Sequence, residues 1–102
     1  MATVAAVLVR IATGWDGGDV PVDPDGFVHL STPAQVPGTV ERHHPGAVHL
    51  VLLVVDPARL PAGALRLEET GHGTFPHLYA PLPANAVVRT APWRPGQPIE
   101  LG

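Results

Sequence analysis

The sequence predicts a small α+β domain dominated by β-sheet, with about six strands and one or two short helices. Three observations support this. The longest apolar run, Val48 to Val55, is almost unbroken, as in a central strand covered on both faces. The 13 prolines and 11 glycines punctuate short apolar runs instead of forming one tract, which favours many short elements over disorder. Thr32-Pro33-Ala34-Gln35 is a helix-start signal.

The other strands, the loops and the helix can be predicted from the local sequence pattern. Further strands are expected at residues 4–11, 26–30, 65–69, 75–80 and 86–90, where apolar residues run or alternate. A Gly- and Asp-rich loop should fill residues 13–25 and end in the turn signal Asp23-Pro24-Asp25-Gly26. The helix should run from Pro33 toward His43, with an irregular first turn because Pro37 lacks an N–H. Residues 92–102 should form an irregular tail, and the 102 residues one domain.

Composition excludes several classes of function. The chain has no cysteine, which excludes disulfides, thiolate metal sites and a cysteine nucleophile and fits a reducing compartment. Its six basic residues are all arginine and the net charge is −3, so long-duplex nucleic acid is not an expected partner. The N-terminal apolar run is short and lacks a basic leader, which argues against a signal peptide or membrane span. We expect a cytoplasmic, bacterial protein.

Two strands carry candidate ligand-binding side chains. Because side chains alternate along a strand, Phe27, His29 and Ser31 share one face. His77 and Tyr79 likewise share a face, so both strands could line one pocket. His29 could exchange a proton near neutral pH or serve as a hydrogen-bonded structural residue. Ser31 could bind a ligand or only cap the helix, and Tyr79 could bind a ligand or only pack.

The order of these motifs resembles domain-of-unknown-function family 952. The resemblance covers about residues 4–90 and is carried by Gly26-Phe27-Val28-His29-Leu30-Ser31-Thr32 and by Phe75-Pro76-His77-Leu78-Tyr79, with Arg66-Leu67-Glu68 between them. The family resembles the ADP-ribosyltransferase fold, which implies two packed, split, mostly antiparallel sheets that hold NAD in a cleft. The implied reaction is transfer of ADP-ribose to an unidentified acceptor.

The resemblance also implies roles for individual residues. Arg10 falls where these enzymes contact the ribose or phosphate of NAD, and His29 and Ser31 fall on a strand beside the cofactor. Glu68 corresponds to a glutamate that stabilises the positive charge on the ribose as nicotinamide leaves. The expected site therefore has Glu68 and His29 as catalytic residues, and its cofactor-binding residues are Arg10, His29, Ser31, His77 and Tyr79.

Two departures from the family pattern favour alternatives. The stretch from Trp15 to Gly26 is shorter than usual, and Leu67 stands where a tryptophan often precedes the glutamate. Both features are compatible with a non-catalytic nucleotide-binding or regulatory module. A metal-dependent hydrolase using His29 and His77 is a third hypothesis, although no helical His-x-x-x-His spacing is present and no metal is expected. The pair His43-His44 is expected at an exposed helix end.

Overall fold

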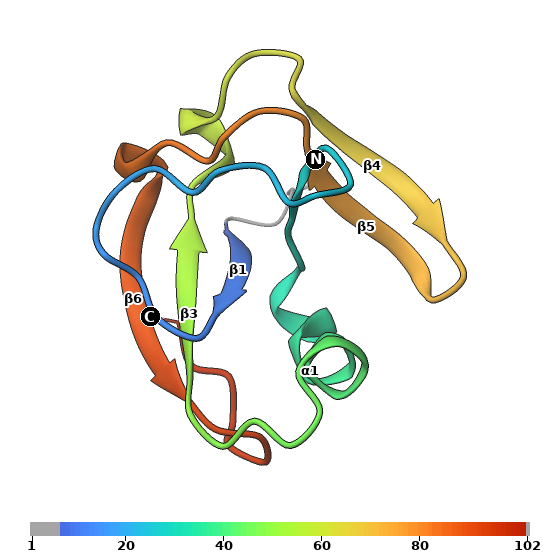
Figure 1. Ribbon diagram of the computed structural model, residues 1–102, viewed down its shortest axis with the longest axis vertical. Coiled ribbons are helices and arrows are strands. Elements are labelled where there is room, and N and C mark those ends of the chain that lie inside the picture. The colour runs from blue at the N-terminus through green and yellow to red at the C-terminus, as the bar shows by residue number, and fades with distance from the viewer. Residues whose placement is uncertain (1–6, 102) are drawn as a thin grey trace, which may run out of the picture.

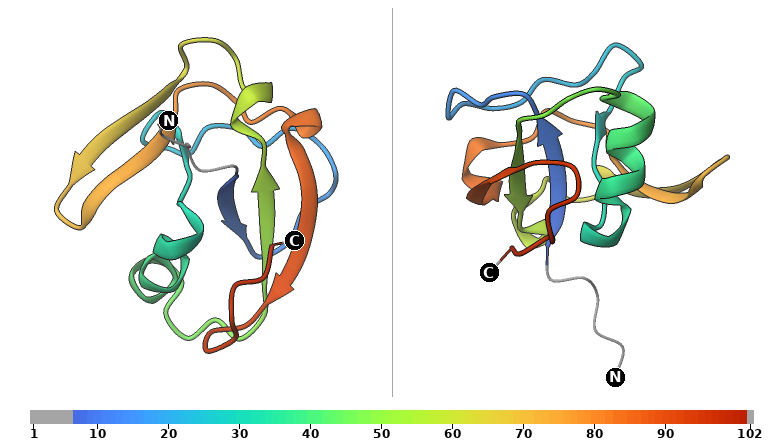
Figure 2. Two further views of the ribbon diagram at one scale, coloured as in Figure 1. Left: turned by 180° about the vertical axis from the view of Figure 1, so that it is seen from behind. Right: turned by 90° about the horizontal axis from the view of Figure 1, so that it is seen from below.

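Two three-stranded antiparallel sheets and one helix make up the fold. The computed structural model describes residues 7–101. Figure 1 shows β6, β3 and β1 side by side, with α1 beside β1 and the β4–β5 hairpin projecting away from them. The other views in Figure 2 give the same arrangement, with α1 on the side of β1 away from β6. The expected α+β class with antiparallel sheets is confirmed.

The first sheet has the order β1-β3-β6, with β1 at Leu8–Ala12, β3 at Leu50–Val55 and β6 at Val87–Trp93. The aliphatic run predicted as the central strand is β3, and it contributes to both hydrophobic clusters of the protein. Its two neighbours pair with it in antiparallel register, Arg10 opposite Leu53 and Thr90 opposite Leu53 from the other side. The prediction for this strand is confirmed.

The second sheet has the order β2-β5-β4, with β2 at Val28–His29, β4 at Leu65–Thr70 and β5 at Gly73–Leu78. Antiparallel pairing places His29 directly opposite His77. The neighbouring ladder places Arg66 opposite His77 and Glu68 opposite Phe75. Because cross-strand partners project to the same face and side chains alternate along a strand, His29, His77, Arg66 and Glu68 project to one side of this sheet.

The helical segment begins with a 3₁₀ turn at Pro33–Gln35 and continues as α1 at Val36–His43. Thr32 is the N-cap, and the side-chain oxygen of Gln35 accepts a hydrogen bond from its backbone N–H at 2.9 Å. The capping box is therefore confirmed, and the first turn is irregular as expected, but Pro37 is not the cause. Pro37 lies in the first turn of α1, where a missing N–H costs no intrahelical bond.

Two hydrophobic clusters hold the elements together. The first joins the two sheets and contains Leu8, Val28, Leu30, Val55, Leu78, Leu82 and Ala86. The second seats α1 on the first sheet and contains Val9, Ile11, Val36, Val40, Leu50, Leu52 and Trp93. Short 3₁₀ turns at Pro57–Arg59 and Ala84–Ala86 lie next to the strands of the first sheet.

Three expected boundaries were wrong, each for a physical reason. The tail begins after Trp93 and not at Pro92, because Pro92 belongs to β6, an edge strand that tolerates a residue without an N–H. β2 has only two residues, because the chain turns from β5 to β1 after Leu30: the N–H of Leu30 still bonds to Pro76 of β5, whereas Ser31 pairs with Val9 of β1. β5 ends at Leu78, and the N–H of Tyr79 bonds to the carbonyl of Ala64 at 2.8 Å.

The alternation of Leu65 and Leu67 with Arg66 and Glu68 predicts a half-buried leucine face on β4, with Glu68 projecting the opposite way. The leucine part of this prediction is partly wrong, because Leu67 is 70% exposed on the outer strand of a hairpin that extends beyond the body of the protein. The direction of Glu68 is confirmed by its pairing with buried Phe75. The part of the first expected strand that precedes residue 7 lies outside the described residues.

Across residues 7–101, no helix has the length and apolar character needed to cross a membrane.

Candidate functional site

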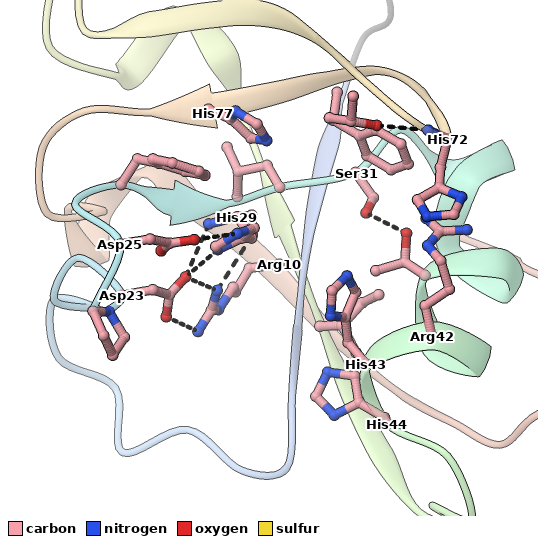
Figure 3. Close-up of a pocket in the computed structure, with 17 residues that line it drawn as sticks. Arg10, Asp23, Asp25, His29, Ser31, Arg42, His43, His44, His72 and His77 are labelled. Atoms are coloured by element: carbon pink, nitrogen blue, oxygen red, sulfur yellow. Dashed lines mark hydrogen bonds and ion pairs between the residues drawn. The ribbon is translucent and has the colours of Figure 1, made fainter.

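A cleft of ≈ 780 Å³ lies between the second sheet, β1 and α1. Its walls carry five histidines, two arginines and two aspartates, an unusual density of ionisable groups for a chain with 15% charged residues. Figure 3 shows Asp23 and Asp25 at one end, where Arg10 and His29 pair with them, and Arg42, His43, His44 and His72 at the other. We call these the acidic end and the basic end.

His29 occupies the acidic end with a carboxylate at each ring nitrogen. Its Nδ1 is 2.8 Å from Oδ2 of Asp23, and its Nε2 is 3.1 Å from Oδ2 of Asp25. The backbone N–H of His29 also donates to Asp23 at 3.1 Å. Since a carboxylate only accepts, the imidazolium form of His29 is the one that can donate to both partners at once.

Arg10 fixes Asp23 from the other side. Its guanidinium makes two hydrogen bonds to that carboxylate, at 2.8 and 3.0 Å, and a third to the carbonyl oxygen of His29 at 3.3 Å. Partial burial tends to raise the pKa of Asp23, but the hydrogen bonds from Arg10 and from His29 outweigh it and lower this pKa to about 2. Asp23 is therefore ionised throughout the physiological range.

The position of Asp23 follows from the turn predicted by its sequence. The N–H of Gly26 bonds to the carbonyl of Asp23 at 2.9 Å, and Gly26 has φ of +99°, a conformation that glycine adopts without strain. The turn brings the loop back along β2, so that Asp23 and Asp25 both face His29. The loop predicted at residues 13–25 therefore connects β1 to β2 and also supplies Asp23 and Asp25 to the cleft.

His77 stands opposite His29 on β5 and has its own carboxylate. Its Nδ1 is 2.8 Å from Oε1 of Glu68, and the hydroxyl of Tyr79 donates to the same oxygen at 2.6 Å. The side chain of His77 is 10% exposed, whereas that of His29 is 40% exposed. The two imidazole rings lie 5.6 Å apart at their centroids.

The hydrogen bonds of this second group also perturb its acid–base behaviour. The hydroxyl of Tyr79 and then the ring of His77 lower the pKa of Glu68 below its ordinary value. The same bond to Glu68 raises the pKa of Tyr79 above 10.0. Glu68 is therefore a stable anion that holds the N–H of His77.

An aromatic wall covers the two histidines. The ring of Phe27 stacks on His77 with centroids 4.1 Å apart and lies 4.5 Å from His29. It also lies 5.1 Å from the ring of Tyr79. Phe27 therefore limits the rotation of both imidazoles and supplies apolar surface between them.

At the basic end, the last turn of α1 contributes Arg42, His43 and His44. Arg42 lies over the ring of Phe75, with its guanidinium carbon 5.5 Å from the centroid. Burial, followed by the charges of His43 and Arg10, lowers the pKa of His44. The pair expected at an exposed helix end therefore ends α1, as predicted, but also lines the cleft, which was not predicted.

Four of the six expected site residues line the cleft: Arg10, His29, Ser31 and His77. Ser31 is buried, and its hydroxyl is 3.3 Å from that of Thr39 on α1. Glu68 and Tyr79 do not line it: Glu68 bonds to His77, and Tyr79 bonds to Glu68 and lies against the ring of Phe27. The structure thus brings the two histidine motifs together, with His29 paired to His77.

The sequence interpretation missed Asp23, Asp25, Arg42 and His72 as residues of the cleft. The two aspartates carried a usable signal, since an Asp-x-Asp turn directly precedes the histidine strand. Trp15 lines a smaller neighbouring pocket and donates its indole N–H to the carbonyl of Gly18 at 2.8 Å.

Among the described residues, Asp23, Asp25 and His29 offer ligand atoms within 4.8 Å of one another. These atoms already bond to each other, and Arg10 holds a fixed positive charge against Asp23. A cation would have to displace the proton of His29 and tolerate that charge. We therefore assign no metal to this cluster.

The comparisons with known proteins identify the family. The profile of the DUF952 family, described as proteins of unknown function, matches residues 12–90. The chain belongs to the DUF952 family. No curated protein matches it.

Solved structures of one relative share the fold of this DUF952 protein. The crystal structure of protein CC0527 from Caulobacter crescentus is 33% identical and has a TM-score of 0.74, with 84% of each chain covered. A crystal structure of a double mutant of CC0527 is 32% identical over the same coverage, with a TM-score of 0.73. The solution structure of CC0527 is also 33% identical and covers 84% of this chain and 83% of that one, with a TM-score of 0.68.

Proposed function

We propose that the cleft binds NAD or a related nucleotide, in the manner of an ADP-ribosyltransferase-like domain with split sheets. The observation that carries this proposal is the basic end of the cleft, where Arg42, His43, His44 and His72 lie together, opposite the hydrogen-bonded group of Asp23, Asp25, Arg10 and His29. The pyrophosphate of NAD is anionic and complements this basic end.

The basic end suits a pyrophosphate. Arg42 carries a fixed charge on a fork of N–H donors, and the histidines beside it add ring N–H groups that can reach further phosphate oxygens. The apolar faces of Phe27 and Phe75 line the same cleft and can pack against a base or a ribose. At ≈ 780 Å³, the cleft also lies within the range of cavities that hold small ligands and cofactors.

The acidic end suits the nicotinamide ribose. Asp23 and Asp25 are the carboxylates that line the cleft, and their oxygens can accept hydrogen bonds from ribose hydroxyls, although the guanidinium of Arg10 offsets part of their negative charge. His29, held between them, would position a ribose hydroxyl. Glu68 would act through His77, which it contacts, and ADP-ribose transfer to an acceptor is the reaction this arrangement favours.

Thermal unfolding with NAD, ADP-ribose, nicotinamide and zinc in one panel tests the proposal. A ligand at a hundred times its dissociation constant adds about 2.7 kcal/mol, which raises the melting temperature of a domain of this size by about 10 °C or more. We expect this rise with NAD and ADP-ribose. If neither nucleotide raises the melting temperature, the proposal is refuted. A rise in melting temperature with zinc alone would favour the metal-dependent alternative.

Two arginine variants make the test specific to the basic end. Arg42→Gln should abolish most of the rise with NAD, because its guanidinium faces the cleft. Arg89→Gln removes the same charge from an exposed position on β6 outside the cleft and should leave the rise intact. Equal effects of the two variants would mean that net charge, and not the cleft, governs binding.

A non-catalytic nucleotide-binding module is the second candidate. The position of Glu68 favours it, because the carboxylate expected to stabilise the ribose charge does not line the cleft. Such a module would give the same rise in melting temperature without releasing nicotinamide.

A further inference from the structure

The two histidines that face each other across β2 and β5 differ in the partners of their ring nitrogens. Both ring nitrogens of His29 lie within 3.1 Å of a carboxylate oxygen, whereas His77 has a carboxylate only at Nδ1. Among the described residues, no hydrogen bond reaches Nε2 of His77, and none of their buried side-chain N or O atoms is left without a partner. That nitrogen is therefore open to the cleft, which His77 lines.

The surroundings of His77 fix which nitrogen carries the proton. The carboxylate of Glu68 can only accept, so Nδ1 of His77 must donate to it and the neutral ring has its lone pair on Nε2. Tyr79 donates to the same carboxylate oxygen, and Arg66 lies over the tyrosine ring, with its guanidinium carbon 4.8 Å from the centroid. Phe27 stacks on the imidazole and holds its plane. A base oriented by a carboxylate in this way is ready to accept a proton.

We propose that His77 is the general base of this cleft and that it activates a hydroxyl nucleophile, water or an alcohol, for attack on the bound nucleotide. Glu68 and Tyr79 are positioning residues that orient the ring of His77. Since they act on that ring and not on the ligand, they need not line the cleft. The inference rests on the proposed binding of NAD and adds the acceptor class and the residue that activates it.

The step balances without a further reactant. The oxygen of the nucleophile forms a bond to the anomeric carbon of the ribose, and the glycosidic C–N bond breaks with its electron pair on the pyridine nitrogen. The proton of the nucleophile moves to Nε2 of His77. Nicotinamide leaves as a neutral molecule and needs no acid.

The protonation pattern of His77 can be measured without any nucleotide. We expect ¹⁵N–¹H correlation spectra at pH 8 to show the tautomer protonated at Nδ1, with the signals assigned by their loss in His77→Gln. Glu68→Gln should shift the population toward the Nε2–H tautomer, because the amide can donate as well as accept. A wild-type ring protonated at Nε2 would overturn the proposal, since that nitrogen would have no lone pair for the nucleophile.

Release of nicotinamide from NAD tests the chemistry. His77→Gln should lower kcat by about 10²- to 10⁴-fold with little change in KM, and added imidazole should restore part of the rate of His77→Ala. Methanol in the buffer should divert product from ADP-ribose to its methyl glycoside in the wild type. His49→Gln, at an exposed histidine outside the cleft, is the matched control and should behave as the wild type.

The outcomes separate this inference from the proposed function. If NAD raises the melting temperature but no nicotinamide is released, binding stands and the general base is overturned. The general base is also overturned if His77→Gln keeps the wild-type kcat while its own melting curve shows a folded protein. If NAD neither binds nor reacts, both proposals fail.

Discussion

The ion pair between Arg10 and Asp23 should make the stability of the protein depend on pH in a defined way. The pKa of Asp23 falls from an ordinary 3.8 to about 2 in the folded protein. At about 1.36 kcal/mol for each pKa unit, this difference is worth about 2.4 kcal/mol, and solvent reaching a side chain that is 21% exposed reduces it to about 2 kcal/mol. A lowered pKa stabilises the folded state above pH 3.8, and the effect is lost as pH falls through about 2.

Urea unfolding of the wild type and of Asp23→Asn measures this contribution. At pH 7 the variant should lose about 2 kcal/mol of unfolding free energy, and the gap should shrink to about half at pH 3 and to about a fifth at pH 2. Asp16→Asn, which removes an exposed carboxylate bonded only to the N–H of Gly18, controls for the loss of one negative charge. A gap between wild type and Asp23→Asn that stays constant from pH 7 to pH 2 would refute the reasoning.

Two further predictions concern the second sheet. Tyr79 is the single tyrosine of the chain, so the absorbance of phenolate reports on its ionisation alone. The pH midpoint of this absorbance change should lie above 10.0 in the wild type and fall toward 10.0 in Glu68→Gln. An unchanged midpoint in the variant would contradict the hydrogen bond between Tyr79 and Glu68. Leu78→Ala, at a side chain with 0% exposure, should lower the free energy of unfolding in urea by about 2–5 kcal/mol. Leu67→Ala, at 70% exposure on the same hairpin, should lower it by less than about 0.5 kcal/mol. Similar losses in the two variants would show that Leu78 is not part of the core.

The sequence predicted correctly those elements that depend only on residues close together in the chain. The unbroken aliphatic run became the central strand β3, and the capping signal at Thr32 became the start of the helical segment. The two histidine strands were predicted to share a site because their motifs repeat, and the structure pairs His29 with His77 directly. Periodicity and capping act within a few residues, so these features are legible in one sequence.

The acidic and basic ends of the cleft depend on contacts between distant parts of the chain. Arg42 reaches the cleft only because α1 packs on the first sheet, and His72 only because the turn between β4 and β5 borders the same cleft. Glu68 was predicted at the ligand, but its bond to His77 is decided by the register of β4 against β5. A shift of one residue in that register would turn Glu68 to the opposite face, and the sequence alone does not fix it.

The backbone around the cleft is tied at the point where the two sheets meet, and this bears on how a ligand would enter. The N–H of Val9 bonds to the carbonyl of Ser31 at 2.8 Å, and the N–H of Ser31 bonds back to Val9 at 2.9 Å, so Arg10 and His29 are positioned by one continuous hydrogen-bonded unit. The carboxylate of Asp25, 54% exposed, is the partner of His29 that can swing away. A ligand hydroxyl could take the place of Asp25 at Nε2 of His29. That ring nitrogen would then keep a hydrogen-bond partner, and no strand would have to move. The cost of binding would then be the reorientation of one exposed side chain, which favours a site that is largely formed before the ligand arrives.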